Sequence, residues 1–408
     1  MKKILAKLAL GITLTSSLVY GENIVPEDGA KLKVWESEGP ELKWLEYVGK
    51  EFDKKYGVKV DFETVAMTDT ISRLEQDGPV GTGADIVVMP HDRLGSGITS
   101  GVIMPNYISG ERINQEFLPT AKNAVTWSDG QVYGFPLAIE TYVMFYNKDL
   151  LPNGVTSFEN LKAWDKENSF TNKKLNKFAF VWEVVNLYYG QAFLGSQGGY
   201  LIGNGGTDKN DIGGNNEGAV NGIKDMLTLK EISVDNPADV NYDSMMGLFR
   251  EGKIATMLNG PWAIEGVRKS NLNFGIQKLP TLNGKQLNPF SGVRTLAVSS
   301  YTQYPKAAQL FADFASSEEM LKKRFEITKQ IPPLAKINEL KEISENEYVS
   351  PILEQAMDST PMPSIIEMGL FWDPFSSALN DVYLEKAQPK EALDKAVKIV
   401  KDQIDSQK

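Results

Sequence analysis

Hydrophobic and polar positions in the first part of the chain alternate between strand-like and helix-like spacing. Short apolar or alternating runs predict three strands, at residues 32–35, 58–62 and 85–89. Apolar residues recur at helical spacing from Glu41 to Tyr56, and Gly57 is placed to end that helix. A further helical stretch ends in the glycine-rich segment 78–83. This order of elements is typical of a parallel α/β sheet with right-handed crossovers.

Charged residues follow the third predicted strand, as His91-Asp92-Arg93. Ligands of open α/β sheets bind beyond the carboxyl ends of the strands, so this segment is a candidate ligand site. The histidine itself belongs to no zinc-binding motif, and we expect it to be a turn or core residue.

The first 21 residues have the pattern of a secretory signal peptide. Three lysines precede an apolar-to-neutral run from Leu8 to Val19, which is too short to span a membrane. Small residues near its end predict cleavage between Gly21 and Glu22. Because the chain has no cysteine to carry a lipid anchor, we expect an exported protein of the Gram-negative periplasm.

Composition restricts the chemistry. The 408 residues suggest two domains, and the net charge of −10 argues against a broad nucleic-acid footprint. With no cysteine and one histidine, thiol chemistry is excluded and a Ser-His-Asp site is disfavoured. Phosphate-binding loops, dinucleotide fingerprints and nucleophile elbows are absent from the sequence. We therefore predict no catalytic residue, no metal and no cofactor, while a pair of hydrolase carboxylates stays an open alternative.

Four aromatic residues beside polar or turn-forming segments suggest a binding site: Tyr188, Tyr189, Trp262 and Trp372. Sugar rings have apolar C–H faces and polar edges, so sugar sites combine flat aromatic faces with carboxylates, amides and arginine. The alternative is that these aromatics belong to the core.

Several motifs occur in one order along most of the chain. They are 84–88 leading to 91–95, 134–140 leading to 146–152, Tyr188-Tyr189 before 198–200, 257–263, and Met362-Pro363 before Phe371-Trp372. In these motifs, over roughly residues 32–404, the chain resembles the maltose/maltodextrin-binding proteins, which are periplasmic receptors of ABC sugar importers.

The resemblance implies an α/β fold of two lobes, the periplasmic-binding-protein type, each lobe a mostly parallel sheet flanked by helices. The chain would cross the hinge near residues 139–141, 291–295 and 341–343. The N-terminal lobe would comprise residues 22–139 plus 295–341, and the C-terminal lobe residues 140–294 plus 342–408. The sugar binds between the lobes, which close over it, and no bond is made or broken.

The resemblance also implies which residues bind the ligand. The polar members match groups that bond sugar hydroxyls, and they are Asp92, Arg93 and the hinge-side carboxylate Glu140. The aromatic members match faces that stack on sugar rings, and they are Tyr188, Tyr189, Trp262 and the indole platform Trp372.

Other positions depart from the family pattern. The family's acid–lysine pair falls at Gly39-Pro40, so Glu38, or else Glu36 or Glu41, would substitute with a different geometry. A family tryptophan, a carboxylate, a tyrosine and an arginine are replaced by Met89, Asn186, Asp373 and Ser376. With Glu38, these four are further candidate ligand contacts. Because a missing partner to a buried hydroxyl costs much affinity, an oligosaccharide is a firmer prediction than maltose itself.

The predicted function is that of a periplasmic substrate-binding protein of an ABC sugar importer, acting as a monomer. Its predicted partners are a maltodextrin-like oligosaccharide and the membrane subunits of the permease, with no nucleic acid. One alternative is a secreted glycoside hydrolase with paired carboxylates. Another is a receptor of the same fold for a polyamine, an iron chelate or a peptide, and Arg93 argues against the polyamine because it repels a cation.

Overall fold

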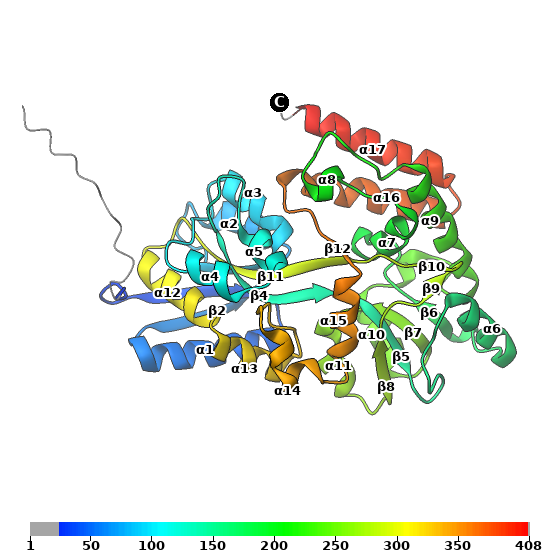
Figure 1. Cartoon of the computed structure of the whole chain (residues 1–408), viewed down its shortest axis with the longest axis horizontal. Helices are drawn as coiled ribbons and strands as arrows, with labels where there is room; N and C mark the ends of the chain where they lie inside the picture. The colour runs from blue at the N-terminus through cyan, green and yellow to red at the C-terminus, as the bar shows by residue number, and fades with distance from the viewer. Residues whose placement is uncertain (1–23, 407–408) are drawn as a thin grey trace, which may run out of the picture.

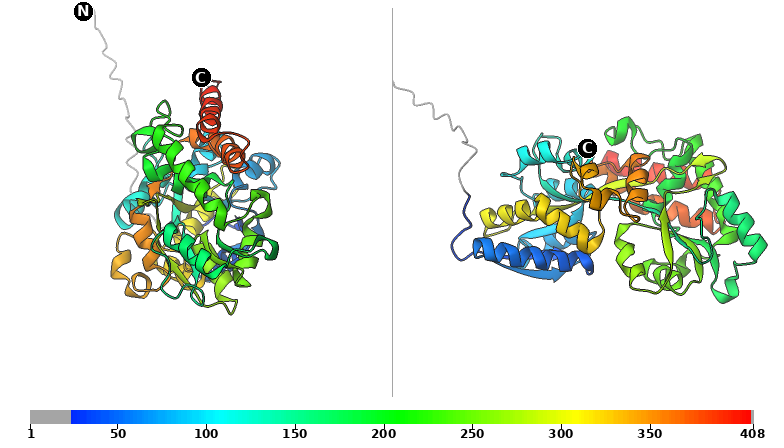
Figure 2. Two further views of the ribbon diagram at one scale, coloured as in Figure 1. Left: turned by 90° about the vertical axis from the view of Figure 1, so that its right-hand side faces the viewer. Right: turned by 60° about the horizontal axis from the view of Figure 1, so that its bottom comes forward.

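The structure is a computed structural model, and it describes residues 24–406. The predicted signal peptide and its cleavage site lie outside the described residues. Two sheets, each flanked by helices, form two lobes that lie side by side (Figure 1), as two further views also show (Figure 2). The α/β fold of two lobes is therefore as predicted.

The N-terminal lobe is built on a six-stranded sheet of order β12-β11-β3-β1-β2. The sixth strand, β4, pairs with the edge of β11 opposite to β3. Its strands are β1 (Lys31–Glu36), β2 (Lys59–Thr64), β3 (Ile86–Pro90), β4 (Gly134–Thr141), β11 (Phe290–Val298) and β12 (Thr360–Pro361). The pairs β1–β2 and β1–β3 are parallel, as the alternating pattern predicts. Strand β11 runs antiparallel to both β3 and β4.

Helices cover the two faces of this sheet. They are α1 (Pro40–Tyr56), α2 (Thr70–Asp77), α3 (Leu94–Thr99), α4 (Gly110–Glu116), α5 (Pro119–Val125), α12 (Pro305–Ala315) and α13 (Glu318–Thr328). Helix α1 ends as predicted at Gly57, whose φ of 70° suits glycine and whose N–H bonds to the Asp53 carbonyl. The three strands and the first helix expected from the sequence are thus confirmed.

The C-terminal lobe is built on a four-stranded sheet of order β6-β7-β5-β8. Its strands are β5 (Val143–Asn147), β6 (Phe178–Val181), β7 (Ile254–Asn259) and β8 (Phe274–Gln277), beside a small hairpin of β9 (Thr281–Leu282) and β10 (Lys285–Gln286). Only the pair β6–β7 is parallel among these four strands, because β5 runs antiparallel to both of its neighbours. The expectation of a mostly parallel sheet is wrong for this lobe. The antiparallel pairing arises because β5 continues directly from β4 and enters the sheet from the hinge side.

The helices of this lobe are α6 (Phe158–Asn168), α7 (Leu187–Leu194), α8 (Gly203–Gly206), α9 (Glu217–Leu227), α10 (Tyr242–Arg250), α11 (Ile264–Arg268), α14 (Lys341–Ser344), α15 (Ser350–Met357), α16 (Trp372–Tyr383) and α17 (Pro389–Ser406). Helices α7, α9, α16 and α17 pack together over one side of the sheet, and α10, α14 and α15 belong to a second core on the other side. No described helix is both long and apolar enough to cross a membrane.

The two lobes are joined by neighbouring strands. Strands β4 and β11 pair antiparallel from Thr141 with Ser291 to Gly134 with Ala297, and they run between the lobes in Figure 1. We call β4 and β11 the hinge strands. Only Tyr142 separates β4 from β5. The exact lobe limits, residues 139/140, 294/295 and 341/342, stay predictions.

Close packing of α7 against α9 leads to the first testable prediction. A methyl group on Gly222 of α9 would lie 2.1 Å from the Phe193 carbonyl oxygen of α7, whereas one on Gly247 of α10 would meet no atom within 4 Å. We expect Gly222→Ala to destabilise the protein by about 1–3 kcal/mol, because the helices must move apart. The matched Gly247→Ala variant should gain up to about 1 kcal/mol from helix propensity. Denaturant unfolding measures both, and a Gly222→Ala variant as stable as Gly247→Ala would contradict the packing.

Candidate functional site

The N-terminal lobe contributes a charged turn to the space between the lobes. Strand β3 ends at Pro90, and a short 3-10 helix, η1 (His91–Arg93), follows it. Asp92 is buried, and its carboxylate oxygen Oδ2 lies 3.7 Å from Nε of Arg93, whose side chain is 35% exposed. The arginine therefore lies partly open to solvent beside a buried carboxylate.

His91 has a structural role, as expected. Its Nδ1 accepts the Val293 N–H at 3.2 Å, so the other ring nitrogen, Nε2, carries the proton and donates to the Met362 carbonyl at 3.0 Å. Both bonds are buried, and they join η1 to hinge strand β11 and to the segment after β12. The histidine thus fixes the turn that presents Asp92 and Arg93.

The hinge contributes Glu140, near the end of β4. Its side chain is buried, and Oε1 lies 3.0 Å from Nε of Arg294 on β11. Strand pairing places Glu140 opposite Gly292, two residues before Arg294, so the pair follows from the register of the hinge strands.

The C-terminal lobe contributes three partly buried aromatic side chains. Tyr188 lies in the first turn of α7, Trp262 in the 3-10 helix η6 (Pro261–Ala263), and Trp372 begins α16. The ring centroid of Tyr188 lies 6.3 Å from that of Trp262 and 6.5 Å from that of Phe290. The Phe290 ring in turn lies 6.5 Å from the indole of Trp372.

These polar and aromatic groups meet between the lobes. The indole of Trp372 lies close enough to Asp92 to lower the pKa of its carboxyl, although the buried Nε1 has no well-aligned hydrogen-bond partner among the described residues. Burial raises the pKa of the Tyr188 phenol well above its usual value, and the nearby Glu140 and Asp92 carboxylates raise it further. We call the group of Asp92, Arg93, Glu140, Tyr188, Trp262 and Trp372 the inter-lobe cluster.

Six other candidates lie outside this cluster. Tyr189 is 3% exposed and packs against Tyr142 and Tyr188, so it supports the cluster from the core. Met89 is fully buried in the core of the N-terminal lobe. Asn186 caps α7 by accepting the Tyr188 N–H at 3.0 Å.

The remaining three candidates are more accessible. Glu38 and Asp373 are exposed, the first in the turn before α1 and the second on α16. Ser376 is half-buried and lies one helical turn after Trp372. In this conformation none of the three is tied to the inter-lobe cluster by a described side-chain contact.

Sequence reasoning considered Glu36 and Glu41 as possible ligand contacts but missed the side chains that hold them behind Glu140, which are Arg294, Arg324 and Gln330. Arg294 Nη1 lies 3.5 Å from Glu36 Oε1 and 3.5 Å from Glu41 Oε1. Gln330 donates to Glu41 at 2.7 Å and accepts from Arg324. We call Glu36, Glu41, Glu140, Arg294, Arg324 and Gln330 the hinge ion cluster. A lone arginine in the apolar run 290–298 was the available signal.

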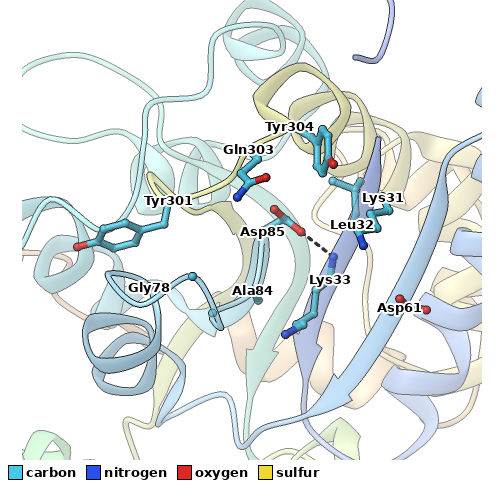
Figure 3. A pocket seen from close by; sticks show the side chains of 12 residues that line it. Lys31, Leu32, Lys33, Asp61, Gly78, Ala84, Asp85, Tyr301, Gln303 and Tyr304 are labelled. Atoms are coloured by element: carbon cyan, nitrogen blue, oxygen red, sulfur yellow. Dashed lines mark hydrogen bonds between the residues drawn. The ribbon is translucent and has the colours of Figure 1, made fainter. Parts of the chain in front are cut away.

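Two cavities differ in their distance from the hinge. One of about 440 Å³ borders the hinge strands and is lined by uncharged groups such as Thr120, Asn123 and Ser291. The other, of about 320 Å³, lies at the start of β1 (Figure 3), where Asp85 accepts the Lys33 N–H at 2.7 Å. Neither lining includes a member of the inter-lobe cluster. Within residues 24–406, no group of acidic or histidine side chains has the arrangement of a metal site.

The chemistry of the inter-lobe cluster suits a neutral ring-shaped ligand rich in hydroxyl groups. Tyr188, Trp262 and Trp372 supply aromatic surface, Asp92 and Glu140 accept hydrogen bonds, and Arg93 donates them as a planar fork. Because the groups come from both lobes and the hinge, a ligand held by all of them joins the lobes.

Comparison with known proteins agrees with this chemistry. The family model described as bacterial extracellular solute-binding protein matches residues 48–350. A galactooligosaccharide-binding protein of Bacillus subtilis (strain 168) is 34% identical over 388 residues, which cover 92% of this chain and 90% of the relative. A maltodextrin-binding protein of the same strain is 30% identical over 406 residues, covering 97% and 95%.

A solved structure extends the likeness to the fold. The crystal structure of MalX from Streptococcus pneumoniae in complex with maltopentaose superposes with a TM-score of 0.85 at 29% sequence identity. The match covers 91% of this chain and 100% of that chain.

The environment of Asp92 leads to a prediction of pH-dependent stability. Burial raises the pKa of the Asp92 carboxyl, although His91 and Arg93 partly oppose the shift. The ionised carboxylate therefore costs folding free energy above the unfolded-state pKa of about 3.9, and the cost disappears below it. We expect ligand-free Asp92→Asn to be more stable than the wild type at pH 7, with the difference vanishing on acidification in urea unfolding experiments.

Asp129 provides the control of opposite sign. The Gln131 N–H and the Tyr133 hydroxyl hold the pKa of the Asp129 carboxyl below its usual value. Asp129→Asn should therefore lose stability at pH 7, and this loss too should vanish in acid. A less stable Asp92→Asn protein at pH 7 would show that the pairing of Asp92 outweighs its burial.

Proposed function

The chain belongs to the family of bacterial extracellular solute-binding proteins, and on that premise we propose that it binds an oligosaccharide of the maltodextrin class between its lobes for an ABC importer. The family is one of binding proteins, not enzymes, and the protein acts outside the cytoplasmic membrane. The hydrolase alternative has no support from the family.

The convergence of three aromatic rings with Asp92, Arg93 and Glu140 carries this proposal. Stacked aromatic faces desolvate the C–H faces of sugar rings, and charged groups bond the hydroxyl edges. The presence of Arg93 beside the aromatic faces also disfavours a cationic ligand such as a polyamine.

The names of the relatives support the class of ligand more strongly than the choice of sugar. One relative is named for galactooligosaccharides and another for maltodextrins. The residues Glu38, Met89, Asn186, Asp373 and Ser376, which replace family sugar contacts, would account for a sugar other than maltose. Their direct contact with ligand stays a prediction.

Transport follows from closing the lobes. A sugar that contacts both lobes favours the closed arrangement by its extra contacts there. The closed monomer then presents a surface formed by both lobes to the permease, which releases the sugar into the transport path. We also propose that the N-terminal signal peptide directs the protein to the periplasm and is removed after Gly21.

A thermal-shift panel tests the proposed ligand. Maltotriose, maltotetraose, a galactooligosaccharide mixture and spermidine are added separately at about 1 mM to the mature protein. A ligand that binds only the folded state raises Tm, and at about 100 times Kd it stabilises by about 2.7 kcal/mol. We expect a rise with a maltooligosaccharide and none with spermidine. A rise with spermidine alone would overturn the proposal, and a rise with galactooligosaccharides alone would reassign the sugar.

Truncation of the indole platform tests the site. We expect Trp372→Ala to weaken binding of the identified oligosaccharide by about 1–3 kcal/mol, because a stacked aromatic contributes that order of binding energy. Isothermal titration calorimetry measures the change in Kd. Trp164→Ala is the matched control, since Trp164 lies on α6 of the same lobe and packs against Phe170, away from the cluster. Equal Kd values for wild type and Trp372→Ala would remove this residue from the site.

A further inference from the structure

The hinge ion cluster places an unusual number of charges out of contact with water. Three carboxylates, of Glu36, Glu41 and Glu140, face two guanidinium groups, of Arg294 and Arg324, and each side chain is at most 8% exposed. Burying charges costs several kcal/mol each, and apolar residues in such places are often equally stable. Stability alone therefore does not explain this arrangement.

Arg294 is the centre of the cluster. Its guanidinium reaches all three carboxylates, with Nε 3.0 Å from Glu140 and Nη1 3.5 Å from both Glu36 and Glu41. Burial alone would lower the pKa of Arg294, but the three carboxylates raise it above its usual value. Burial also lowers the pKa of Arg324 to about 10, with Arg294 adding to that effect. Arg294 is thus the more firmly charged of the two.

The two oxygens of Glu140 have different surroundings. Oε1 faces Arg294 and, at 3.5 Å, the Gln330 amide. Oε2 makes no hydrogen bond with any described residue and keeps some exposure to solvent. Arg294 therefore holds Oε1 of Glu140 and leaves Oε2 available to the other members of the inter-lobe cluster or to a ligand.

The surroundings make the contact between Arg294 and Glu140 hard to replace. Arg294 belongs to a strand paired on both sides, so its backbone is fixed. Nε and Nη1 of both arginines and Oε2 of Glu36 lack aligned hydrogen-bond partners among the described residues. A network that is ion-paired but incompletely hydrogen-bonded has few spare contacts, so removing one member alters the positions of the others.

We propose that Arg294 is a positioning residue for oligosaccharide binding, which fixes the Glu140 carboxylate so that its second oxygen accepts a sugar hydroxyl. The inference rests on the proposed function. Arg294 need not touch the sugar, and its effect on affinity should pass through Glu140. A lysine cannot match the planar fork that reaches three carboxylates, so Arg294→Lys should restore the function only in part.

A double-mutant cycle tests this coupling. Kd for maltotetraose, or for the galactooligosaccharide if only that binds, is measured by calorimetry in wild type, Arg294→Met, Glu140→Gln and the double variant. We expect Arg294→Met to weaken binding about tenfold or more in the wild-type background, as for loss of a charged hydrogen-bond contact. In the Glu140→Gln background its effect should be less than about threefold, because the group it positions is already changed. Arg294→Lys should give an intermediate Kd.

Arg112→Met is the matched control for losing a networked arginine of the same lobe. Arg112 donates to Asp313 at 2.8 Å and to Ser316, and none of these three residues belongs to either cluster. It should lower Tm without changing Kd. If Arg294→Met does not fold, Glu36→Gln/Arg294→Met removes one charge of each sign and takes its place in the cycle.

The measured Kd values separate a failure of the Arg294–Glu140 coupling from a failure of the proposed sugar binding. Equal weakening by Arg294→Met in both backgrounds would show that Arg294 acts independently of Glu140, and unchanged binding would show that it does not act; either result overturns the inference. If the wild type binds neither sugar, the proposed function fails instead.

Discussion

The antiparallel pairing of β4 with β11 is the interaction on which the arrangement of both lobes depends. These strands complete the sheet of the N-terminal lobe, and β4 leads straight into the sheet of the C-terminal lobe. Their register also sets the chemistry, since it brings Glu140 within reach of Arg294. A shift of one strand by one residue would place the two side chains on opposite faces of the sheet and break their ion pair. Strand register and electrostatics therefore require the same pairing.

The two lobes divide the chemistry of the proposed site between them. Directional groups come from the N-terminal lobe and the hinge, as Asp92, Arg93 and Glu140, and each is held by ion pairs or by the turn that His91 fixes. Aromatic surface comes from the C-terminal lobe, on helices packed into its core. Polar groups then fix the orientation of a ligand while the aromatic groups supply its buried area. Because the two sets lie on different lobes, the arrangement favours a ligand that both lobes enclose.

Local sequence patterns predicted the early strands and helix, whereas contacts between distant parts of the chain were not predicted. The strands and helix between residues 32 and 89 follow from periodicity, and the likeness to a known family gave the α/β fold of two lobes. The direction of β5 was missed because nothing in its own residues shows that it enters its sheet from the hinge. Arg294 was missed for a similar reason, since its partners Glu36, Glu41 and Glu140 lie more than 150 residues earlier and only folding brings them together. The burial of Tyr189 and the capping by Asn186 likewise depend on how α7 meets the core.

Tyr142, the one residue between β4 and β5, has a consequence for how the proposed lobe closure would proceed. Its side chain is fully buried, and its hydroxyl accepts the Ala192 N–H at 3.1 Å and donates to the Tyr189 carbonyl at 3.3 Å, both on α7. These two hydrogen bonds fix the β4–β5 connection to α7, the helix that carries Tyr188. A rotation of the backbone at Tyr142 would therefore carry α7 and its Tyr188 side chain with it. If the lobes close as proposed, Tyr188 is already fixed on a helix, so less conformational entropy is lost on binding than if this side chain lay on a mobile loop.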